Sequence, residues 1–484
     1  MLAQTQAAGM VDPVTLSLIQ WVQQQIQTKR DGYELFRRYY RGDHRTMLTD
    51  RLRKFLELGP SKDLRFRDNF CEVVVDSMAE RLTVTGFDAG SEDLDKWLWD
   101  TWQTNRMDRA QAVVHTETLA LGDGYVLIDW DNEAQRLRFH SQEAEMMIPH
   151  RNGSTGEMEW ISKVWVQQQG HTPAQNAGTT TLMNLYFPDR IEKFRAQSGI
   201  WLRRSDEGET DWPVPWLDKS GAPLGLPLIH FRNASLSDDY GHSELSNAIP
   251  MQDVLNKLLI DLVMVADTAG FPQRYVVNID TGKTELEIVP GSYMEFHTEP
   301  EQTFAVGQFD AADLEKMLSA IEMVVQHIAG ITRTPQHLFH ILGNYPSGEA
   351  LKTAEAGLVA KIIERQVDFG NSWEDVMMVA LRIQNAFGEA APGASGDVIL
   401  NTLWKDPQMR NEKDHIEALA IKREKLNVSQ EQIWREAGYS QEDIDRIREE
   451  LDTARERDNN IGAVLLGSFN RGGGGGGTQA VGAP

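Results

Sequence analysis

The sequence predicts an α+β chain of several domains, and three observations support this prediction. Apolar residues recur at helical spacing near both ends of the chain, whereas residues from about 122 to 232 alternate between apolar and polar side chains. Next come a helical pattern, an insert of about forty residues with short β-like pieces, and a second helical pattern. A chain of 484 residues, 41% of them hydrophobic, is long enough for roughly two to four domains with their own cores.

The N-terminal part is expected to be helical. Apolar residues lie one helical turn apart between residues 14 and 27, and aromatic residues continue this spacing through "DGYELFRRYY". "NFCEVVVDSMAERLTV" is expected to form a short helix or a helix followed by a strand. Its Cys71 is the single cysteine, so intramolecular disulfides and cysteine metal cages are excluded, and the apolar neighbours predict a buried thiol.

Residues 94–121 are expected to form one or two helices. They carry Trp97, Trp99 and Trp102, which we assign to a core rather than to a ligand cage. From Gly122 onward the period changes to two, in segments such as "GYVLIDWD", "EMEWISKVWVQQ" and "GIWLRRSD". This region is expected to form an antiparallel sheet that ends near residue 232.

Two helices are expected around residues 246–269 and 311–331, and Pro250 suits the first turn of the former. The insert between them, residues 271–310, is rich in Pro, Gly and short alternating pieces. The order helix, β-rich insert, helix predicts a two-helix stalk that carries a small tip.

A very long helix is expected after Ser347, because apolar residues recur in steps of three, four or seven up to Ile383. A helix of about 35 residues would measure on the order of 50 Å, so it needs packing along its length from other domains or subunits. Ser347 has the character of its N-cap, and Glu349 in the first turn suits the helix dipole.

The C-terminal region predicts further helices, with breaks at Asn427 and at Gly438. Ser429 and Gln432 have the spacing of a capping box. Six consecutive glycines follow Arg471, and this tail cannot bury apolar surface, so we expect it to be flexible.

The formal net charge is −24, which disfavours tight binding to DNA phosphates. The charge is uneven, since residues 244–349 hold fifteen Asp and Glu against five Lys and Arg. No basic, apolar leader and no run of about 18 apolar residues is visible. We therefore expect a soluble chain without a membrane segment.

The segment "HLFHILGNYPSGEALK", which begins at His337, invites a catalytic interpretation. Its two glycines do not form a P-loop, because Glu349 stands where the phosphate-binding lysine belongs. Ser347 lacks the G-x-S-x-G elbow, and His337 and His340 have no third metal ligand within sequence range. We predict no catalytic residue, no cofactor and no metal site.

Four stretches carry a resemblance to a known family: "YYRGDHRTML", "DNFCEVVVDSMAERLTVTGFD", "IPMQDVLNKLLIDLVMVADTAGFPQRYV" and "GITRTPQHLFHILGNYPSGEALKTAEAGLVAKIIERQVDFGNSW". In these stretches and their order, the chain resembles portal proteins of tailed double-stranded DNA bacteriophages. The resemblance is greatest to those of long-tailed phages that infect actinobacteria, and it covers residues 10–460.

The resemblance implies a ring, commonly of twelve subunits, at one capsid vertex of the virion, assembled in the host cytoplasm. DNA would pass through it during packaging and ejection. The implied parts are a wing (1–240, helical N-terminus and antiparallel β region), a first stem helix (241–270), a clip (271–310), a second stem helix (311–332), a tunnel loop (333–347), a long wing and tunnel helix with its return (348–404), a helical crown (405–460) and the Gly-rich tail (461–484). The implied partners are the terminase large subunit, a head–tail adaptor, and the major capsid and scaffolding proteins.

Within the resemblance, the residues that would approach DNA at the narrowest point of the channel are Ile341, Leu342, Gly343, Asn344, Tyr345, Pro346 and Ser347. The acidic residues of the stem and clip are Asp253, Asp261, Asp267, Glu285, Glu287 and Glu295. Repeated around a ring, such carboxylates would repel phosphates and let DNA slide without tight binding. Acidic residues on a helix are also commonly just side chains that face solvent. Two other functions stay open at this point: another ring-forming connector or capsid component, and a hydrolase centred on residues 337–349.

Overall fold

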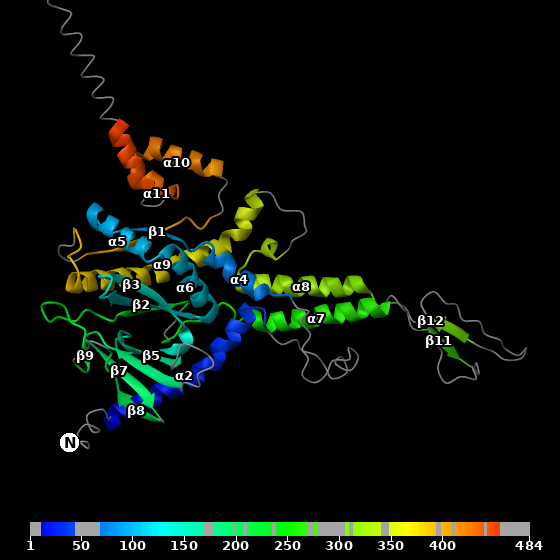
Figure 1. Cartoon of the computed structure of the whole chain (residues 1–484). Helices are drawn as coiled ribbons and strands as arrows, with labels where there is room; N and C mark the ends of the chain where they lie inside the picture. Colours follow the sequence, from blue (N-terminus) through cyan, green and yellow to red (C-terminus); the bar gives the residue numbers. More distant parts are fainter. Residues whose placement is uncertain are drawn as a thin grey trace, which may run out of the picture.

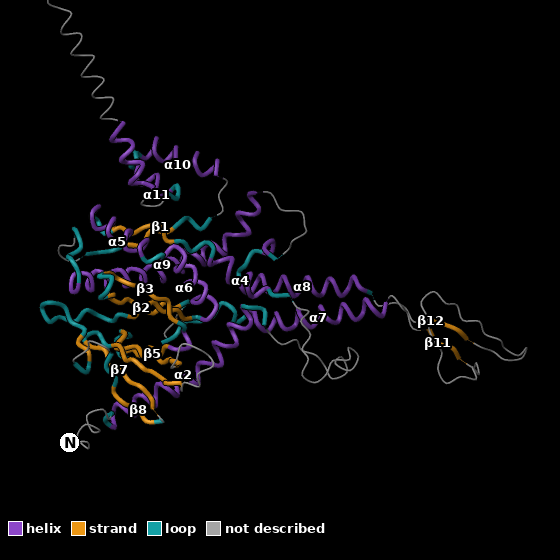
Figure 2. The backbone as a smooth tube through the Cα atoms, in the orientation of Figure 1, coloured by secondary structure: helices purple, strands orange, loops and turns teal. Residues whose placement is uncertain are grey.

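A computed structural model describes residues 11–43, 68–168, 179–197, 199–206, 211–234, 239–269, 274–277, 305–308, 313–339, 348–393, 398–408, 412–439 and 443–454. The described part mixes helices with antiparallel sheets, as the sequence predicts (Figures 1 and 2). A body of helices and sheets carries a pair of long helices that project from it. Among the described residues, no helix is long and apolar enough to cross a membrane.

Helix α2 (Pro13–Tyr40) covers the N-terminal segments for which the sequence predicts helix. The Asp12 carboxylate caps it by accepting bonds from the backbone N–H groups of Val14 and Thr15. Its Ile19 and Val22 pack on the larger sheet. The strands of that sheet are β4 (Met147–Arg151), β5 (Met158–Gln168), β6 (Thr179–Tyr186), β7 (Arg190–Gln197) and β8 (Ile200–Arg203), paired in this order, with β9 (Val214–Pro215) on β7.

The predicted β region forms two sheets rather than one. The second sheet pairs β10 (Leu228–Arg232), β2 (Asp123–Asp131) and β3 (Arg136–Gln142) in that order. β10 therefore returns across about a hundred residues to lie beside β2. The short 3₁₀ turn η1 (Ala144–Met146) links the two sheets.

The main core lies between the second sheet and a layer of helices. These are α4 (Phe70–Ala79), α5 (Glu92–Thr104), α6 (Met107–Leu121) and α9 (Gly348–Phe387). Trp102 contacts Trp373 of α9 with ring centroids 4.9 Å apart, and Phe231 contacts the other side of Trp373 at 4.6 Å. Trp99 and Trp102 are buried and Trp97 packs against the same core, which confirms their predicted role.

Two single residues of this core, Cys71 and His115, have a pKa shifted by burial. Cys71 is fully buried, as predicted, and burial raises the pKa of its thiol to about 12. His115, for which the sequence predicts nothing, accepts a bond from the Trp373 indole N–H at 2.9 Å and faces the Leu82 carbonyl at 3.0 Å. Burial lowers the pKa of His115 to about 4, so the ring is neutral at pH 7.

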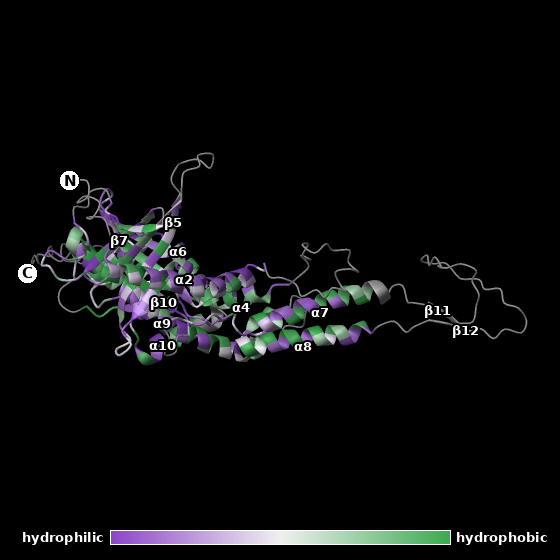
Figure 3. Ribbon diagram, turned by 90° about the horizontal axis from the view of Figure 1, so that it is seen from below, coloured by the Kyte–Doolittle hydropathy of each residue, from purple (hydrophilic) through white to green (hydrophobic). Residues whose placement is uncertain are grey.

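The expected helical stalk consists of α7 (Ala248–Ala269) and α8 (Leu314–Thr332), which lie side by side and project from the body (Figures 1 and 3). At the far end, β11 (Arg274–Val277) pairs antiparallel with β12 (Ala305–Gln308). The short helix η2 (Gln336–Leu338) follows α8.

The long helix α9 begins at Gly348 and ends at Phe387, close to the predicted bounds. After it, β13 (Asn401–Trp404) pairs with β1 (Val84–Asp88). The C-terminal helices are α10 (Glu412–Leu426), α11 (Gln430–Glu436) and residues 443–454. The Ser429 hydroxyl accepts the backbone N–H of Gln432, which confirms the predicted cap.

Candidate stem and channel site

Most of the predicted site residues lie outside the described part of the chain. This holds for residues 341–347 of the tunnel loop, for His340, and for Glu285, Glu287 and Glu295 of the clip. Asp267 lies in α7, but its side chain is not among those described. Of the six predicted acidic residues, the side chains of Asp253 and Asp261 are therefore the ones that the structure describes.

Asp253 lies where the stem meets the wing. Its carboxylate accepts a bond of 2.7 Å from the Tyr39 hydroxyl, near the end of α2. Burial raises the pKa of Asp253, and the bond from Tyr39 opposes part of that rise. Asp253 thus joins α7 to α2.

Asp261 lies farther along the stem and is more exposed. Lys257, one turn earlier on α7, forms an ion pair with it. On α8, Glu315 and Glu322 are exposed. Along both stem helices the sequence places five acidic residues against two lysines, so the stem is acidic overall.

The base of the stem is held by two buried amide side chains of α7. Gln252 accepts the backbone N–H of Phe70 at 2.9 Å and donates to the Asp68 carbonyl at 2.8 Å. Asn256 accepts the backbone N–H of Asp68 at 3.0 Å. These bonds satisfy backbone groups at the start of α4, and so they fix the position of α7 on the body.

An apolar cluster fills the space beside these amides. It combines residues of α4, α7, α8 and η2: Val74, Leu255, Val324, Val325, Ile328, Ala329 and Phe339. The Phe70 and Phe339 rings meet edge to face, with centroids 5.2 Å apart. The apolar contact joins both stem helices to the wing at one point.

A buried cluster of charges connects the stem to the long helix. Glu244, just before α7, forms ion pairs with Lys361 and Arg365 of α9, and these three side chains are 5 to 10% exposed. Asn233 also donates to Glu244 at 3.0 Å, and Lys361 donates to the Thr332 carbonyl at the end of α8 at 3.2 Å. The Glu244–Lys361–Arg365 cluster therefore ties both stem helices to α9.

The protonation state of Glu244 follows from these partners. Burial alone would raise its pKa, but the charge of Lys361 and the bonds from Lys361, Asn233 and Arg365 outweigh burial and lower it below the ordinary value. Glu244 is therefore ionised at neutral pH, as the paired cations require.

A second buried cluster combines residues of η2 and α9 with Arg81. Glu355, in the first turns of α9, receives two bonds from the Arg81 guanidinium, at 3.1 and 3.2 Å. His337 of η2 approaches the same carboxylate at 3.3 Å. Glu355 thus connects the segments on the two sides of residues 340–347 to each other and to the end of α4.

Apolar side chains remain exposed on the stem and on α9. They are Val254 and Val263 on α7, Leu318, Met323 and Ile331 on α8, and Ile363, Val367 and Phe387 on α9. Figure 3 shows that hydrophobic residues occur along the length of both stem helices. Exposed apolar stripes of this kind are typical of helices that pack against another subunit.

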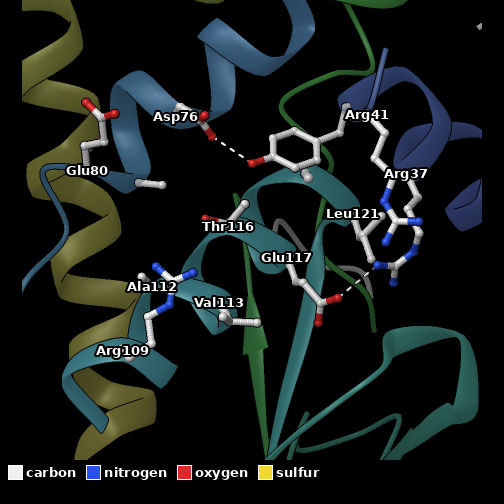
Figure 4. A pocket seen from close by; sticks show the side chains of 13 residues that line it. Arg37, Arg41, Asp76, Glu80, Arg109, Ala112, Val113, Thr116, Glu117 and Leu121 are labelled. Atoms are coloured by element: carbon white, nitrogen blue, oxygen red, sulfur yellow. Dashed lines mark hydrogen bonds and ion pairs between the residues drawn. The ribbon is translucent and has the colours of Figure 1, made fainter. Parts of the chain in front are cut away.

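The hypothesis of a catalytic centre requires a cavity that is lined by reactive or charged side chains. A cavity of about 440 Å³ lies between α2, α4 and α6 (Figure 4). On its walls, Arg37 pairs with Glu117 at 3.0 Å, and the Tyr40 hydroxyl donates to Asp76 at 2.9 Å. Within the described ranges, no three His, Cys, Asp or Glu side chains are grouped as a metal site would require.

The sequence analysis missed the two buried ion clusters. A signal for one of them was present, because the apolar stripe of α9 runs through Ile362 and Phe369 and is interrupted by Arg365. A charged residue inside an apolar stripe indicates a buried partner. The partner itself, Glu244, is more than a hundred residues away and carries no local signal.

The comparisons with known proteins define the class of protein. Residues 19–457 match the family described as "Phage portal protein, SPP1 Gp6-like". The chain belongs to this family of phage portal proteins. The predicted resemblance is therefore confirmed.

Two relatives are portal proteins of mycobacterial phages, in agreement with the predicted group of phages. The chain is 27% identical to the portal protein of Mycobacterium phage D29 over 356 residues, which are 69% of this chain and 67% of that one. It is also 27% identical to the portal protein of Mycobacterium phage L5 over 360 residues, with the same coverage. Among solved structures, a chain from the neck of an empty GTA particle covers 76% of this chain and 88% of its own length, with a TM-score of 0.40 and 11% identity.

Proposed function

We propose that this chain is one subunit of a ring-shaped channel at a single capsid vertex, through which DNA enters and leaves the phage head. The observation that carries the proposal is the family match, which extends over residues 19–457. The pair of stem helices and the long helix α9 are the elements that would surround the channel.

The exposed apolar residues of α7, α8 and α9 support assembly into a ring. Side chains such as Met323 and Val367, which are 54% and 60% exposed in the single subunit, would be covered by neighbouring subunits. Closed rings require one such surface to meet a different surface of the next subunit. A ring of twelve subunits is the number that the family resemblance implies.

The acidic stem supports passage of DNA without tight binding. Binding of lysine and arginine to phosphates releases counterions and builds affinity, which would hold DNA in place. Carboxylates at Asp261, Asp267, Glu315 and Glu322, repeated around the ring, would instead repel the phosphate backbone. Glu285, Glu287 and Glu295 would extend this repulsion to the clip, and the uncharged loop 341–347 would form a collar around the DNA.

The proteins that this chain would bind follow from its proposed function as a channel subunit. The clip, residues 271–310, would dock the terminase large subunit during packaging and a head–tail adaptor afterwards. The wing would contact the major capsid and scaffolding proteins. The chain would act as a structural component, and hydrolysis of ATP would fall to the terminase.

Genetic complementation tests this proposal. Phage that lack this chain should assemble heads without DNA, and the wild-type chain supplied in the host should restore filled heads and infectivity. Heads that fill normally without the chain would refute a portal function. An ATPase and nuclease assay on the purified chain tests the hydrolase alternative, for which activity abolished by Ser347→Ala or His340→Ala is the required result.

A further inference from the structure

A row of cationic side chains crosses one face of the six-stranded sheet. Lys163 of β5 lies directly opposite Asn184 of β6, and Asn184 lies opposite Lys193 of β7. Arg204, just after β8, donates its backbone N–H to the Lys193 carbonyl at 2.9 Å. Residues that pair across neighbouring strands share one face of the sheet, so these four side chains are neighbours.

One carboxylate neutralises part of this charge. Asp206 accepts the Lys193 ammonium at 2.7 Å and lies 3.3 Å from the Arg204 guanidinium. The Asn184 side-chain oxygen accepts another Arg204 N–H at 3.2 Å, and the Asn184 amide donates to the Tyr186 hydroxyl at 3.0 Å. Two of the three cations thus have a carboxylate partner.

Lys163 is the third cation, and it differs from the other two. It is half-buried, and no carboxylate of the described residues lies within ion-pair distance of its ammonium group. Its ammonium lies 4.9 Å from the centre of the Trp165 ring. Burial lowers the pKa of Lys163, and no neighbouring charge contributes to this shift.

The three cations line one cavity of about 250 Å³ between the two sheets. Its wall also includes Trp165, Tyr186 and, from β2, Asp129. The Asp129 side chain is exposed, so solvent and salt weaken its effect, and one of its oxygens accepts the backbone N–H of Trp130. Three cations against Asp206 and Asp129 leave a net charge of +1 at this cavity, and a burial of like charges is unfavourable unless an anion enters.

We propose that this cavity is a binding site for a tetrahedral oxyanion, a phosphate or sulfate group, with Lys163 as its principal ligand. The cavity of about 250 Å³ has room for such a group beside the Trp165 ring, and its negative charge would complement the excess of positive charge on the cavity wall. The site lies in the wing, and the inference does not depend on the proposed channel function.

Titration calorimetry with inorganic phosphate at pH 7 and constant ionic strength tests the site on the intact chain. We expect one phosphate per subunit for the wild type, and at least tenfold weaker binding for Lys163→Met. Lys163→Arg keeps the charge and should retain binding. Lys96→Met is the matched control, because Lys96 is an exposed lysine on α5, and it should bind phosphate as the wild type does.

Lys163→Met should fold, since it removes a half-buried cation that has no counterion. Its melting temperature without phosphate is expected to be no lower than that of the wild type. A short oligodeoxynucleotide added to the phosphate complex identifies the source of the group. If the oligodeoxynucleotide displaces the bound phosphate, the site takes a phosphate group carried on a polymer. If the bound phosphate is not displaced, the site takes a free anion. Wild-type protein that binds no phosphate at millimolar concentration, or Lys163→Met that binds as tightly as wild type, would overturn the proposal.

Discussion

Glu244 is the residue on which the joint between the stem and the long helix most depends. It is buried, it precedes α7, and its two oxygens pair with Lys361 and Arg365 of α9. Breaking a buried ion pair from one side leaves the other charges without a partner in a medium of low polarity. The cluster is therefore sensitive to the loss of its one carboxylate.

Glu244→Gln should destabilise the chain by about 3 kcal/mol, because it removes the carboxylate that pairs with the buried Lys361 and leaves Arg365 only its pairs with Glu364 and Asp368. Thermal unfolding of the purified variant measures this effect. Glu322→Gln is the control, since Glu322 is exposed on α8, and it should unfold as the wild type does. Equal melting temperatures for Glu244→Gln and the wild type would contradict the role of the cluster.

The same cluster should make the folding stability of the chain depend on pH in the acidic range. The pKa of Glu244 in the folded chain lies below the ordinary value of 4.5, so its contribution to stability is present above pH 4.5 and is lost as the pH falls through the folded pKa. We expect the wild type to lose stability more steeply below pH 4.5 than Glu244→Gln does. Parallel curves of melting temperature against pH would show that Glu244 contributes nothing to the acid transition.

The burial of single residues could be predicted from the sequence where the neighbouring residues already indicate it. The burial of Cys71 and of the tryptophans of α5 followed from apolar neighbours and helical spacing. The pairs of Glu244 with Lys361 and of Glu355 with Arg81 could not be predicted, because each pair joins segments more than a hundred residues apart. Asp253 illustrates the same limit, since only the fold brings the Tyr39 hydroxyl to it.

At the scale of elements, the two stem helices combine a packed inner face with exposed apolar side chains. Leu318 and Met323 of α8 are 48% and 54% exposed, although Val324 and Val325 beside them are buried. In the proposed ring, the exposed residues of this helix would contact the next subunit. The two faces of α8 therefore have separate functions.

Leu318→Glu combined with Met323→Glu should prevent ring assembly, because burial of two carboxylates in a subunit contact is unfavourable. The fold of the subunit should survive, since both positions are exposed in it. Light scattering after size-exclusion chromatography would then report a folded monomer. Gln326→Glu, at an exposed polar position of the same helix, is the control and should leave the rings intact.

Asp261→Lys combined with Glu322→Lys should slow DNA packaging, because the new cations would bind phosphates in the channel. The rate of packaging into purified heads measures this effect, and the rings themselves should form normally. Glu133→Lys, in the exposed turn between β2 and β3, controls for an overall change of charge. Packaging at the wild-type rate in the double variant would contradict the electrostatic part of the account.

Long helices were the elements best predicted from the sequence. The patterns at 246–269, 311–331 and from Ser347 to Ile383 correspond to α7, α8 and α9 within four residues at each end. The β region was predicted as antiparallel, but its division into two sheets was not. That division depends on β10 returning to pair with β2, and local alternation carries no information on such a distant pairing.

At the scale of the whole molecule, α9 unites parts of the chain that lie far apart in sequence. Its Trp373 packs between Trp102 and Phe231, and its Lys361 and Arg365 reach the stem. The C-terminal helices are attached to the body by ion pairs, such as the pair of Arg448 with Glu92. The body, stem and C-terminal helices are therefore connected through a small number of defined contacts.

The most direct test of the central claim is averaged electron microscopy of the purified chain, with native mass spectrometry of the same sample. We expect a ring with an open axial channel, a stem that projects from one side, and a mass that is a whole multiple of the 54.7 kDa subunit, twelve according to the family resemblance. A stable monomer, or a closed particle without a channel, would contradict the account.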